Sequence, residues 1–170
     1  MTGDSLIIRE AVESDFPQIW QIFHEVVSAG DTYAYDRDTS ESEAHRHWME
    51  IPARTFVAEE HGTVLGTYYI KKNHPGPGSH VCNCGYMVSE SARGRGLATS
   101  MCEHSQNLAL ELGFKAMQFN LVVETNTGAA KLWQKLGFEI VGTIPKAFQH
   151  PDNGYVGAHV MFKWLSDDDN

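Results

Sequence analysis

The sequence predicts an α/β fold built on a mixed sheet, and three observations carry that prediction. Strand-like and helix-like segments follow one another in the order β-α-α-β-β-β-α-β-α-β-β. A turn of Gly and Arg, residues 93–96, joins a strand directly to a helix. Both late helices end in the tripeptide Leu-Gly-Phe, at residues 112–114 and 136–138, which is typical of a Schellman stop. No linker or internal repeat divides the 170 residues, so we expect a single domain over residues 1–170.

The first strand and the first helix follow from local patterns near the N-terminus. Leu6–Glu10 is a short run rich in β-forming residues. Apolar residues then recur at helical spacing over residues 16–27. We expect Ser14 or Asp15 to cap this helix and Gly30 to end it.

A second helix and a hairpin are expected next. Ser40 and Glu43 form a capping box at the start of the helix, and Pro52 stops it. The alternating runs Thr55–Glu60 and Thr63–Lys71 flank a His-Gly pair that suits a tight turn.

The second half of the chain is expected to hold two helices and four strands. The helices are expected over residues 97–112 and 126–136, the first with an apolar face of Leu97, Met101, Leu108 and Leu112 around the small Ser105. The expected strands are His80–Val88, Lys115–Val123, Glu139–Ile144 and Tyr155–Lys163, with a loop over Pro145–Gly154. The second of these strands has one apolar face of Met117, Phe119, Leu121 and Val123, and a polar face of Gln118 and Asn120.

Composition and charge exclude several classes of function. The formal net charge of −9 argues against a general nucleic-acid or membrane-surface role, which needs clustered basic residues. The three cysteines, Cys82, Cys84 and Cys102, lack C-x-x-C spacing and predict buried thiols in a reducing compartment rather than a metal site. The N-terminus MTGDS is polar, and no run of about 18 apolar residues occurs. We therefore expect a cytoplasmic protein without a signal peptide or membrane span.

The turn Arg93-Gly94-Arg95-Gly96 is the strongest candidate for a binding site. It opens a helix whose first backbone N–H groups lack partners and carry the positive end of the helix dipole. The glycines let a ligand approach the backbone, and the arginines add positive charge. The turn is therefore predicted to bind a pyrophosphate; the alternative is a helix start that is merely rich in Gly and Arg.

Two motifs in this region resemble those of one enzyme family. Arg93-x-x-Gly96-x-Ala98 is similar to the Q/R-x-x-G-x-G/A signature of the GNAT superfamily of N-acetyltransferases. The stretch NTGAAKLWQKLGF, residues 126–138, resembles the family's N-x-x-A-x-x-L-Y-x-K-x-G-F motif. The resemblance implies the GNAT fold, a mixed and mostly antiparallel sheet of six or seven strands flanked by four helices, with splayed central strands.

The resemblance also implies acetyl-CoA as the co-substrate, with no metal. The cofactor would lie in the gap between the strands over residues 80–88 and 115–123, where one backbone N–H would polarise the thioester carbonyl. The implied cofactor-binding residues are Met87, Val88, Arg93, Gly94, Arg95, Gly96, Leu97, Ala98, Thr99, Asn126, Ala129 and Trp133.

Trp133 departs from the family pattern, because many members carry a tyrosine at this position. An indole N–H donates a hydrogen bond but has no accessible proton to give, so the role of a protein acid toward the leaving thiolate is in doubt. Water is the alternative. His80, Glu124 and His150 are candidate general bases, each with a surface role as the alternative.

Four polar residues are candidates for the acceptor site. Asn83 and Asn120 are predicted as catalytic and substrate-binding residues, because they stand on the two splayed strands and amides can hold a carboxylate or an amine or orient a water. The alternative is an amide satisfied within the sheet. Tyr33 and Tyr35 are predicted to bind substrate in a lid over the site, with surface packing as the alternative.

A closer resemblance gives the substrate class. The segments GDTYAY (30–35), CNCGY (82–86), QFN (118–120) and GTIP (142–145) are similar to those of proline-analogue (azetidine-2-carboxylate) acetyltransferases. The loop from Gln149 to Tyr155 is similar to that of phosphinothricin-type acetyltransferases. These likenesses imply an acetyl-CoA-dependent N-acetyltransferase that acetylates a small amino- or imino-acid-like amine by direct attack in a ternary complex.

Two other functions stay open at this point. One is a protein N-terminal or lysine acetyltransferase, and the other is a catalytically inactive CoA-binding sensor module. The expected partners are a small-molecule amine and, at most, a second copy of the chain in a homodimer, with no nucleic acid and no membrane.

Overall fold

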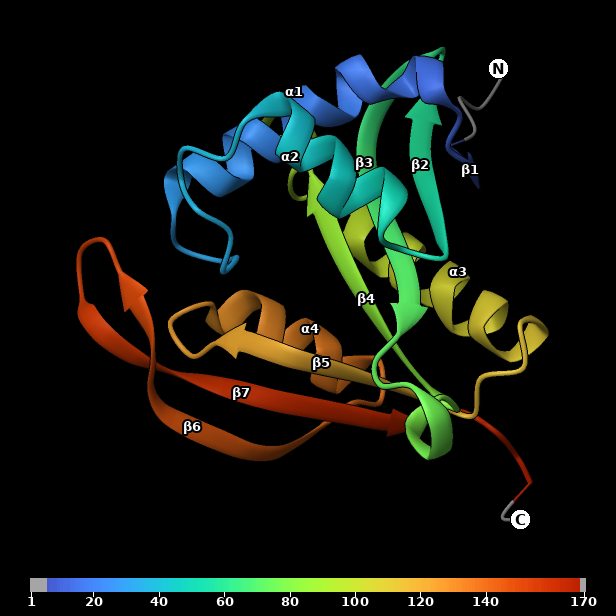
Figure 1. Ribbon diagram of the computed structural model, residues 1–170, viewed down its shortest axis with the longest axis vertical. Helices are drawn as coiled ribbons and strands as arrows, with labels where there is room; N and C mark the ends of the chain where they lie inside the picture. Colours follow the sequence, from blue (N-terminus) through green and yellow to red (C-terminus); the bar gives the residue numbers. More distant parts are fainter. Residues whose placement is uncertain (1–5, 169–170) are drawn as a thin grey trace.

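The computed structural model describes residues 6–168, and the N-terminal stretch MTGDS lies outside them. Within the described residues the chain forms four α-helices and a seven-stranded sheet (Figure 1). The helices are α1 (Phe16–Ala29), α2 (Glu41–His45), α3 (Leu97–Glu111) and α4 (Thr127–Lys135). The strands are β1 (Ile7–Glu10), β2 (Arg54–Glu60), β3 (Thr63–Lys72), β4 (Val81–Val88), β5 (Ala116–Val123), β6 (Glu139–His150) and β7 (Gly154–Trp164). The predicted element order is confirmed.

The sheet has the order β1-β2-β3-β4-β5-β7-β6, and its neighbouring strands are antiparallel except for β4 and β5. The parallel β4–β5 ladder holds only two pairs, Val81 with Ala116 and Cys82 with Met117. Beyond these pairs the strands diverge. Figure 1 shows β4 rising toward α1, whereas β5 runs in a different direction, away from α1. The predicted splay of the central strands is confirmed.

Two hydrophobic clusters, one on each face of the sheet, hold the helices in place. On one face, buried side chains of α1 and Trp48, from the π-helical turn that extends α2, pack against Val57, Tyr69 and Met87. On the other face, α3 and α4 contribute Met101 and Trp133 to a larger cluster with β3, β4 and β5. The two clusters fix the helices relative to β4, the strand that borders the splay.

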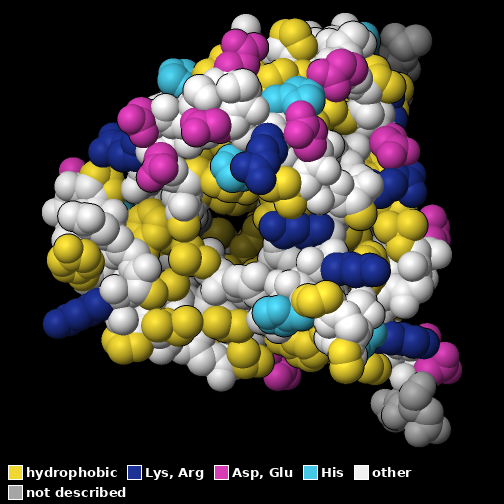
Figure 2. Space-filling model, viewed as in Figure 1, with side chains coloured by type: hydrophobic (Ala, Val, Ile, Leu, Met, Phe, Trp, Pro, Cys, Tyr) yellow, Lys and Arg dark blue, Asp and Glu magenta, His cyan; other side chains and the backbone are white. Residues whose placement is uncertain are grey.

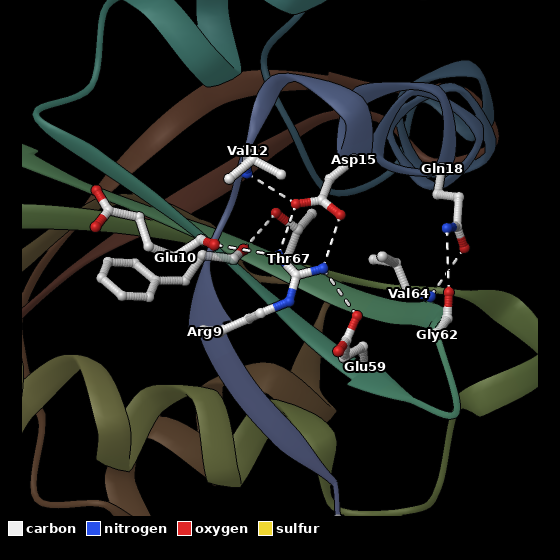
Figure 3. Close-up of polar contacts among 10 residues, drawn as sticks. Arg9, Glu10, Val12, Asp15, Gln18, Glu59, Gly62, Val64 and Thr67 are labelled. Carbon is white, nitrogen blue, oxygen red and sulfur yellow. Dashed lines mark hydrogen bonds and ion pairs between the residues drawn. The ribbon is translucent and has the colours of Figure 1, made fainter.

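Polar contacts tie the start of α1 to β1 and to the β2–β3 hairpin (Figure 3). The Arg9 guanidinium lies 2.8 Å from both carboxylate oxygens of Asp15 and 2.8 Å from the Glu59 carboxylate. Hydrogen bonds from Arg9 hold the pKa of Asp15 below its ordinary value. The Val64 N–H donates to the Gln18 side chain at 2.9 Å, which joins the helix to the hairpin.

The predicted end of α1 and the predicted start of α2 are confirmed, but the predicted cap of α1 needs a correction. Gly30 ends α1 with a φ of 72°, and the predicted capping box begins α2. Asp15 stands at the N-cap of α1, but its carboxylate accepts from the Val12 N–H rather than from the first turn of the helix. A 3-10 turn leads into the helix, so Ser14 is not the cap.

Both Leu-Gly-Phe stops have the predicted geometry. Gly113 and Gly137 have φ values of 89° and 97°. The Phe N–H that follows each glycine donates to the carbonyl five residues back, at 2.9 Å and 3.0 Å respectively. The predicted apolar face of α3 needs one correction. Leu112 lies beyond the last helical residue and is 40% exposed.

Strand β5 changes face partway along its length. Its register with β7 shifts between Phe119 and Val122. Met117 and Phe119 belong to the cluster beneath α3 and α4, whereas Leu121 and Val123 belong to a separate small cluster. The prediction of a single apolar face is wrong beyond Phe119, because the irregularity inverts the alternation of side chains.

Strand β6 runs to His150, so the predicted loop Pro145–Gly154 is wrong and shrinks to a turn over residues 151–153. Pro145 is tolerated because β6 lies at the edge of the sheet, where a missing N–H costs no ladder bond. The register with β7 also shifts just beyond this proline. The long β6–β7 hairpin extends the sheet on the far side of the splay.

Candidate active site

A cavity of about 920 Å³ lies in the gap between β4 and β5. Its walls come from these strands, the end of β3, the loop after α1, the N-terminal end of α3, and α4. Figure 2 shows the molecule hollowed between the α1–α2 side and the β5–β7 side. The structure brings nearly all predicted site residues to this cavity, namely Tyr33, Tyr35, Asn83, Met87, Val88, Arg93, Gly94, Gly96, Leu97, Ala98, Thr99, Asn120, Asn126, Ala129 and Trp133.

The glycine–arginine turn forms one end of the cavity. Gly94 and Gly96 have φ values of 77° and 79°, which favour glycine. The first hydrogen bond of α3 joins the Ser100 N–H to the Gly96 carbonyl at 3.1 Å and leaves the N–H groups of residues 97–99 outside the helical ladder. A Cβ atom on either glycine would meet no described atom within 4 Å. The free N–H donors are therefore open to an approaching anion.

The two arginines of the turn have different environments. Arg93 lines the cavity, and among the described residues no carboxylate forms an ion pair with it. The Arg95 guanidinium instead lies 2.8 Å from the Glu60 carboxylate on β2. Arg95 is thus the one predicted cofactor-binding residue that does not line the cavity.

Helix α4 presents a small residue and an indole to the cavity. Asn126 caps the helix, with its Oδ1 accepting from the Ala129 N–H at 3.4 Å. The Trp133 side chain is 9% exposed and packs beside the rings of Tyr86 and Phe119, each 5.2 Å away between centroids. Trp133 is therefore a fixed apolar wall at the point where α4 meets β4 and β5.

A tyrosine hydroxyl replaces β5 as the partner of β4 above the short ladder. The Tyr86 N–H donates to the Tyr33 hydroxyl at 2.7 Å, and the hydroxyl donates to the Tyr86 carbonyl at 2.6 Å. The Tyr35 ring stacks on Tyr33 with 5.9 Å between centroids. These hydrogen bonds tie the loop after α1 to β4, and the loop forms one wall of the cavity.

The alternation of β4 leaves a free backbone donor in the gap. The Tyr86 N–H points to the gap, as its bond to Tyr33 shows, whereas the Ser89 N–H donates across to β3, at the Leu65 carbonyl. Because successive N–H groups of a strand point to opposite edges, the Val88 N–H lies on the gap edge and that of Met87 faces β3.

The two predicted asparagines differ in burial and in partners. Asn83 is buried, its Nδ2 donating to the Gln118 carbonyl at 2.9 Å and its Oδ1 accepting from the Tyr69 hydroxyl at 3.1 Å. It bridges β4 and β5 directly beyond their last ladder pair. Asn120 is exposed and exchanges hydrogen bonds with the side chains of Gln118 and Asn73. Both asparagines line the cavity as predicted, but only Asn83 is buried.

The aromatic side of the cavity presents neutral groups at physiological pH. Burial raises the pKa of Tyr33, Tyr35 and Tyr69 above the ordinary value of a phenol, so their hydroxyls stay protonated. Burial also raises the pKa of the Cys84 thiol, which lines the same cavity. This wall offers hydrogen bonds but neither a phenolate nor a thiolate.

The three candidate bases from the sequence lie away from this cavity. The His80 ring packs beside Trp164, and the Glu124 carboxylate accepts from the Gly157 N–H at 2.7 Å. His150 accepts backbone N–H groups of the β6–β7 turn. The prediction of a base among these three has no support from their positions.

Two charged residues that the sequence did not mark do line the cavity. Asp31 comes from the loop after α1, and Lys71 comes from the end of β3. Lys71 reaches the site because the β3–β4 register sets it opposite Asn83. A local sequence motif does not show which residues face each other across two strands. Only an argument about the register of the β3–β4 pair could have placed Lys71 beside Asn83.

Within residues 6–168, no group of three or more His, Cys, Asp or Glu side chains is arranged to hold a metal ion. No helix in this part of the chain has the length and apolarity needed to cross a membrane.

The family model for the acetyltransferase (GNAT) family matches residues 15–138, which include the glycine–arginine turn and α4. This chain belongs to the GNAT family. A GCN5-related N-acetyltransferase from Kribbella flavida has the same fold with a TM-score of 0.91 and is 48% identical, over 96% of this chain and 100% of that one. N-acetyltransferase aca1 of Schizosaccharomyces pombe is 32% identical over 151 residues, 79% of this chain and 72% of the relative.

A third GNAT protein shows the fold alone. The phosphinothricin acetyltransferase (Pat) from Sinorhizobium meliloti, solved in complex with AcCoA, has a TM-score of 0.85 at 22% identity and covers 96% of this chain and 90% of its own. Together with the family match, these likenesses confirm the predicted GNAT fold and the predicted class of enzyme, an N-acetyltransferase.

Proposed function

We propose that this GNAT enzyme transfers the acetyl group of acetyl-CoA to the amine of a small amino or imino acid in a ternary complex. The observation that carries the proposal is the cavity between β4 and β5, which joins the glycine–arginine turn to the wall formed by Tyr33, Tyr35 and Asn83. The GNAT protein from Sinorhizobium meliloti, which has the same fold, was solved in complex with AcCoA, and this supports acetyl-CoA as the co-substrate.

The residues of the cavity fit acetyl-CoA. The free N–H groups of residues 97–99 and the unpaired Arg93 are suited to the pyrophosphate. Small side chains at Ala98 and Ala129 leave room for the pantetheine arm. When bound, acetyl-CoA supplies an acyl thioester. The Val88 N–H, on the gap edge of β4, is the proposed donor toward charge that develops on the thioester oxygen.

The other half of the cavity is suited to a small acceptor. The Tyr33 hydroxyl is hydrogen-bonded to β4, and the Tyr35 ring stacks on the Tyr33 ring. These contacts hold this wall of the cavity in place. Asn83 and Asn120 supply amide groups at the base of the splay. A pocket with a fixed wall of neutral donors on one side suits a small polar molecule better than an extended peptide.

The titratable groups that line the cavity favour direct attack by the amine over a covalent acyl-cysteine route. The acceptor must lose a proton before it attacks, and Asp31 is the one carboxylate among the described lining residues, so we assign proton removal to Asp31, acting directly or through water. Burial keeps Cys84 as a thiol, which argues against an acyl-cysteine route. A thiol of pKa about 8.5 can leave as a thiolate without a protein acid.

A panel of acceptors tests the proposal. Thiol release from acetyl-CoA is measured with amino acids, imino acids, polyamines and short peptides with free N-termini, and mass spectrometry checks the acetylated product. We expect amino or imino acids to exceed peptides in kcat/KM by at least roughly 100-fold. A preference for peptides would support protein acetylation instead. Tight acetyl-CoA binding without turnover of any amine would support a sensor module.

Replacing Trp133 with Phe tests whether the indole only packs. Because the indole lies between Tyr86 and Phe119 and has no proton to give, kcat should stay within about tenfold, a barrier change of at most about 1.4 kcal/mol. Steady-state kinetics decide the matter. A loss of roughly 1,000-fold in protein that still binds acetyl-CoA would mean that Trp133 takes part in the reaction.

Replacing Asn120 with Ala tests the acceptor pocket. We expect kcat/KM for the acceptor to fall roughly 100-fold, about 2.7 kcal/mol of transition-state stabilisation. Acetyl-CoA affinity and thermal stability should barely move, because the side chain is exposed. Asn153→Ala, which removes an exposed amide from the β6–β7 turn, is the matched control. Normal turnover by Asn120→Ala would leave this amide a purely structural role.

A further inference from the structure

Lys71 is a cation in the cavity wall that the proposed chemistry does not use. It is half-buried near the end of β3, and its Nζ lies 5.2 Å from the centroid of the Tyr69 ring. Among residues 6–168, no carboxylate lies within ion-pair distance of this ammonium. An uncompensated positive charge in the cavity of a chain with net charge −9 is a place where an anionic ligand is stabilised.

The β3–β4 register sets this ammonium beside the acceptor pocket. Lys71 is opposite Asn83, and directly opposite residues in an antiparallel pair project from the same face, with Cβ atoms about 5 Å apart. One Asn83 Nδ2–H is taken by the Gln118 carbonyl, and its second N–H remains for a ligand. The Tyr69 hydroxyl donates a hydrogen bond to Oδ1 of Asn83 and so fixes the orientation of this amide. Ammonium and amide therefore form a pair of donors at the base of the splay.

Lys71 is far from the turn that suits the phosphates of the cofactor. The β4 residues Asn83 and Val88 are five positions apart, roughly 17 Å at about 3.3 Å per residue. Arg93 and the N-terminus of α3 follow Val88, at the opposite end of the cavity. The two cations that line the cavity among the described residues, Arg93 and Lys71, therefore lie at its two ends.

We propose that Lys71 binds the carboxylate of the acceptor and makes the enzyme select amino or imino acids over amines that lack this group. The inference rests on the proposed function and deepens it. Asn83 contributes its second amide N–H to the same carboxylate, which places the amine of the acceptor toward the thioester side of the cavity.

Acceptors that differ only in carrying a carboxylate or a carboxamide isolate the contribution of the carboxylate. Azetidine-2-carboxylate, proline, alanine and methionine are each compared with their carboxamides, on the wild type, Lys71→Met and Lys72→Met. Lys72 is the control, since it has the same charge, is exposed and projects from the opposite face of β3. The lower basicity of an amide's amine is the same for all three proteins, so it cancels when their acid-to-amide ratios of kcat/KM are compared.

We expect the acid-to-amide ratio of kcat/KM to be equal in wild type and Lys72→Met, and to fall roughly 10- to 100-fold in Lys71→Met, the range for the loss of a charge-assisted hydrogen bond. Acetyl-CoA affinity, measured by calorimetry, should be equal in all three proteins. An unchanged ratio in Lys71→Met, or a loss of acetyl-CoA affinity in that variant, would overturn the inference.

Equilibrium binding separates this inference from the proposed function. The four acids are titrated by calorimetry into each protein saturated with CoA, so that turnover is not required. Binding to wild type and Lys72→Met with a loss of at least roughly tenfold in Lys71→Met supports the role of Lys71 even if no acid is acetylated. Equal binding by the three proteins, or no binding of any acid to wild type, overturns it.

Discussion

Gly96→Glu is expected to remove acetyl-CoA binding while the fold survives. The substitution puts a carboxylate at the N-cap of α3, beside the free N–H groups of residues 97–99 that are suited to the pyrophosphate. Two like charges about 4 Å apart near a protein surface repel by about 4 kcal/mol, which corresponds to roughly 1,000-fold in affinity. Calorimetric titration with acetyl-CoA measures the loss.

Gly113→Glu is the matched control for this substitution. Gly113 ends the same helix with a φ of 89°, and a Cβ atom there also meets no described atom within 4 Å. Both variants therefore carry the same charge and a similar strain, about 1–2 kcal/mol for a side chain in the left-handed region. Equal acetyl-CoA affinity in the two variants would mean that the glycine–arginine turn is not the phosphate site.

Asn83→Ala is expected to lower the free energy of unfolding by about 3 kcal/mol, because it leaves the Tyr69 hydroxyl and the Gln118 carbonyl without their partner. Asn83 stands directly beyond the last β4–β5 ladder pair, so its loss also loosens the base of the splay. Urea denaturation of the folded variant measures the change. The acceptor kcat/KM should fall as well, since the same amide faces the cavity.

Two further variants make this prediction specific. Asn120→Ala removes an exposed amide from the facing strand and should stay within about 0.5 kcal/mol of wild type. Tyr69→Phe with Asn83→Ala should cost less than the sum of the single changes, because the hydroxyl that would be orphaned is absent. If Asn83→Ala unfolds at the same urea concentration as wild type, the bridge between β4 and β5 carries no stability.

Local rules predict the helices and turns of this chain well. A capping box such as the one at Ser40 and stops such as those at Gly113 and Gly137 depend on residues a few positions apart, and the structure has all three. The glycine–arginine turn is also local, since two glycines with positive φ and a helix start define it. Most of the predicted cofactor residues follow from this turn and from the cap of α4.

Features that depend on strand pairing were not predictable in the same way. The irregularity of β5 between Phe119 and Val122 inverts its faces, and the length of β6 is set by its pairing with β7 rather than by alternation. Arg95 forms an ion pair with Glu60 of β2, a residue that is distant in the sequence. A charge motif alone does not reveal which arginine a distant carboxylate will neutralise.

The acceptor site shows the same limit. The sequence marks Asn83 and Asn120 as unusual residues in strands, but only the register explains that one bridges the splay and the other is exposed. Lys71 enters the site solely as the cross-strand neighbour of Asn83. The side chains proposed to decide substrate choice therefore come from several strands, whereas those suited to the cofactor come from continuous segments.

A crystal structure with CoA and azetidine-2-carboxylate tests the central claim most directly. We predict the pyrophosphate on the N–H groups of residues 97–99 beside Arg93, the pantetheine arm between β4 and β5, and the acceptor carboxylate between Lys71 and Asn83. CoA bound outside the splay of β4 and β5 would contradict the account. An acceptor whose carboxylate points away from Lys71 would retain the cofactor site and refute the assignment of the acceptor pocket.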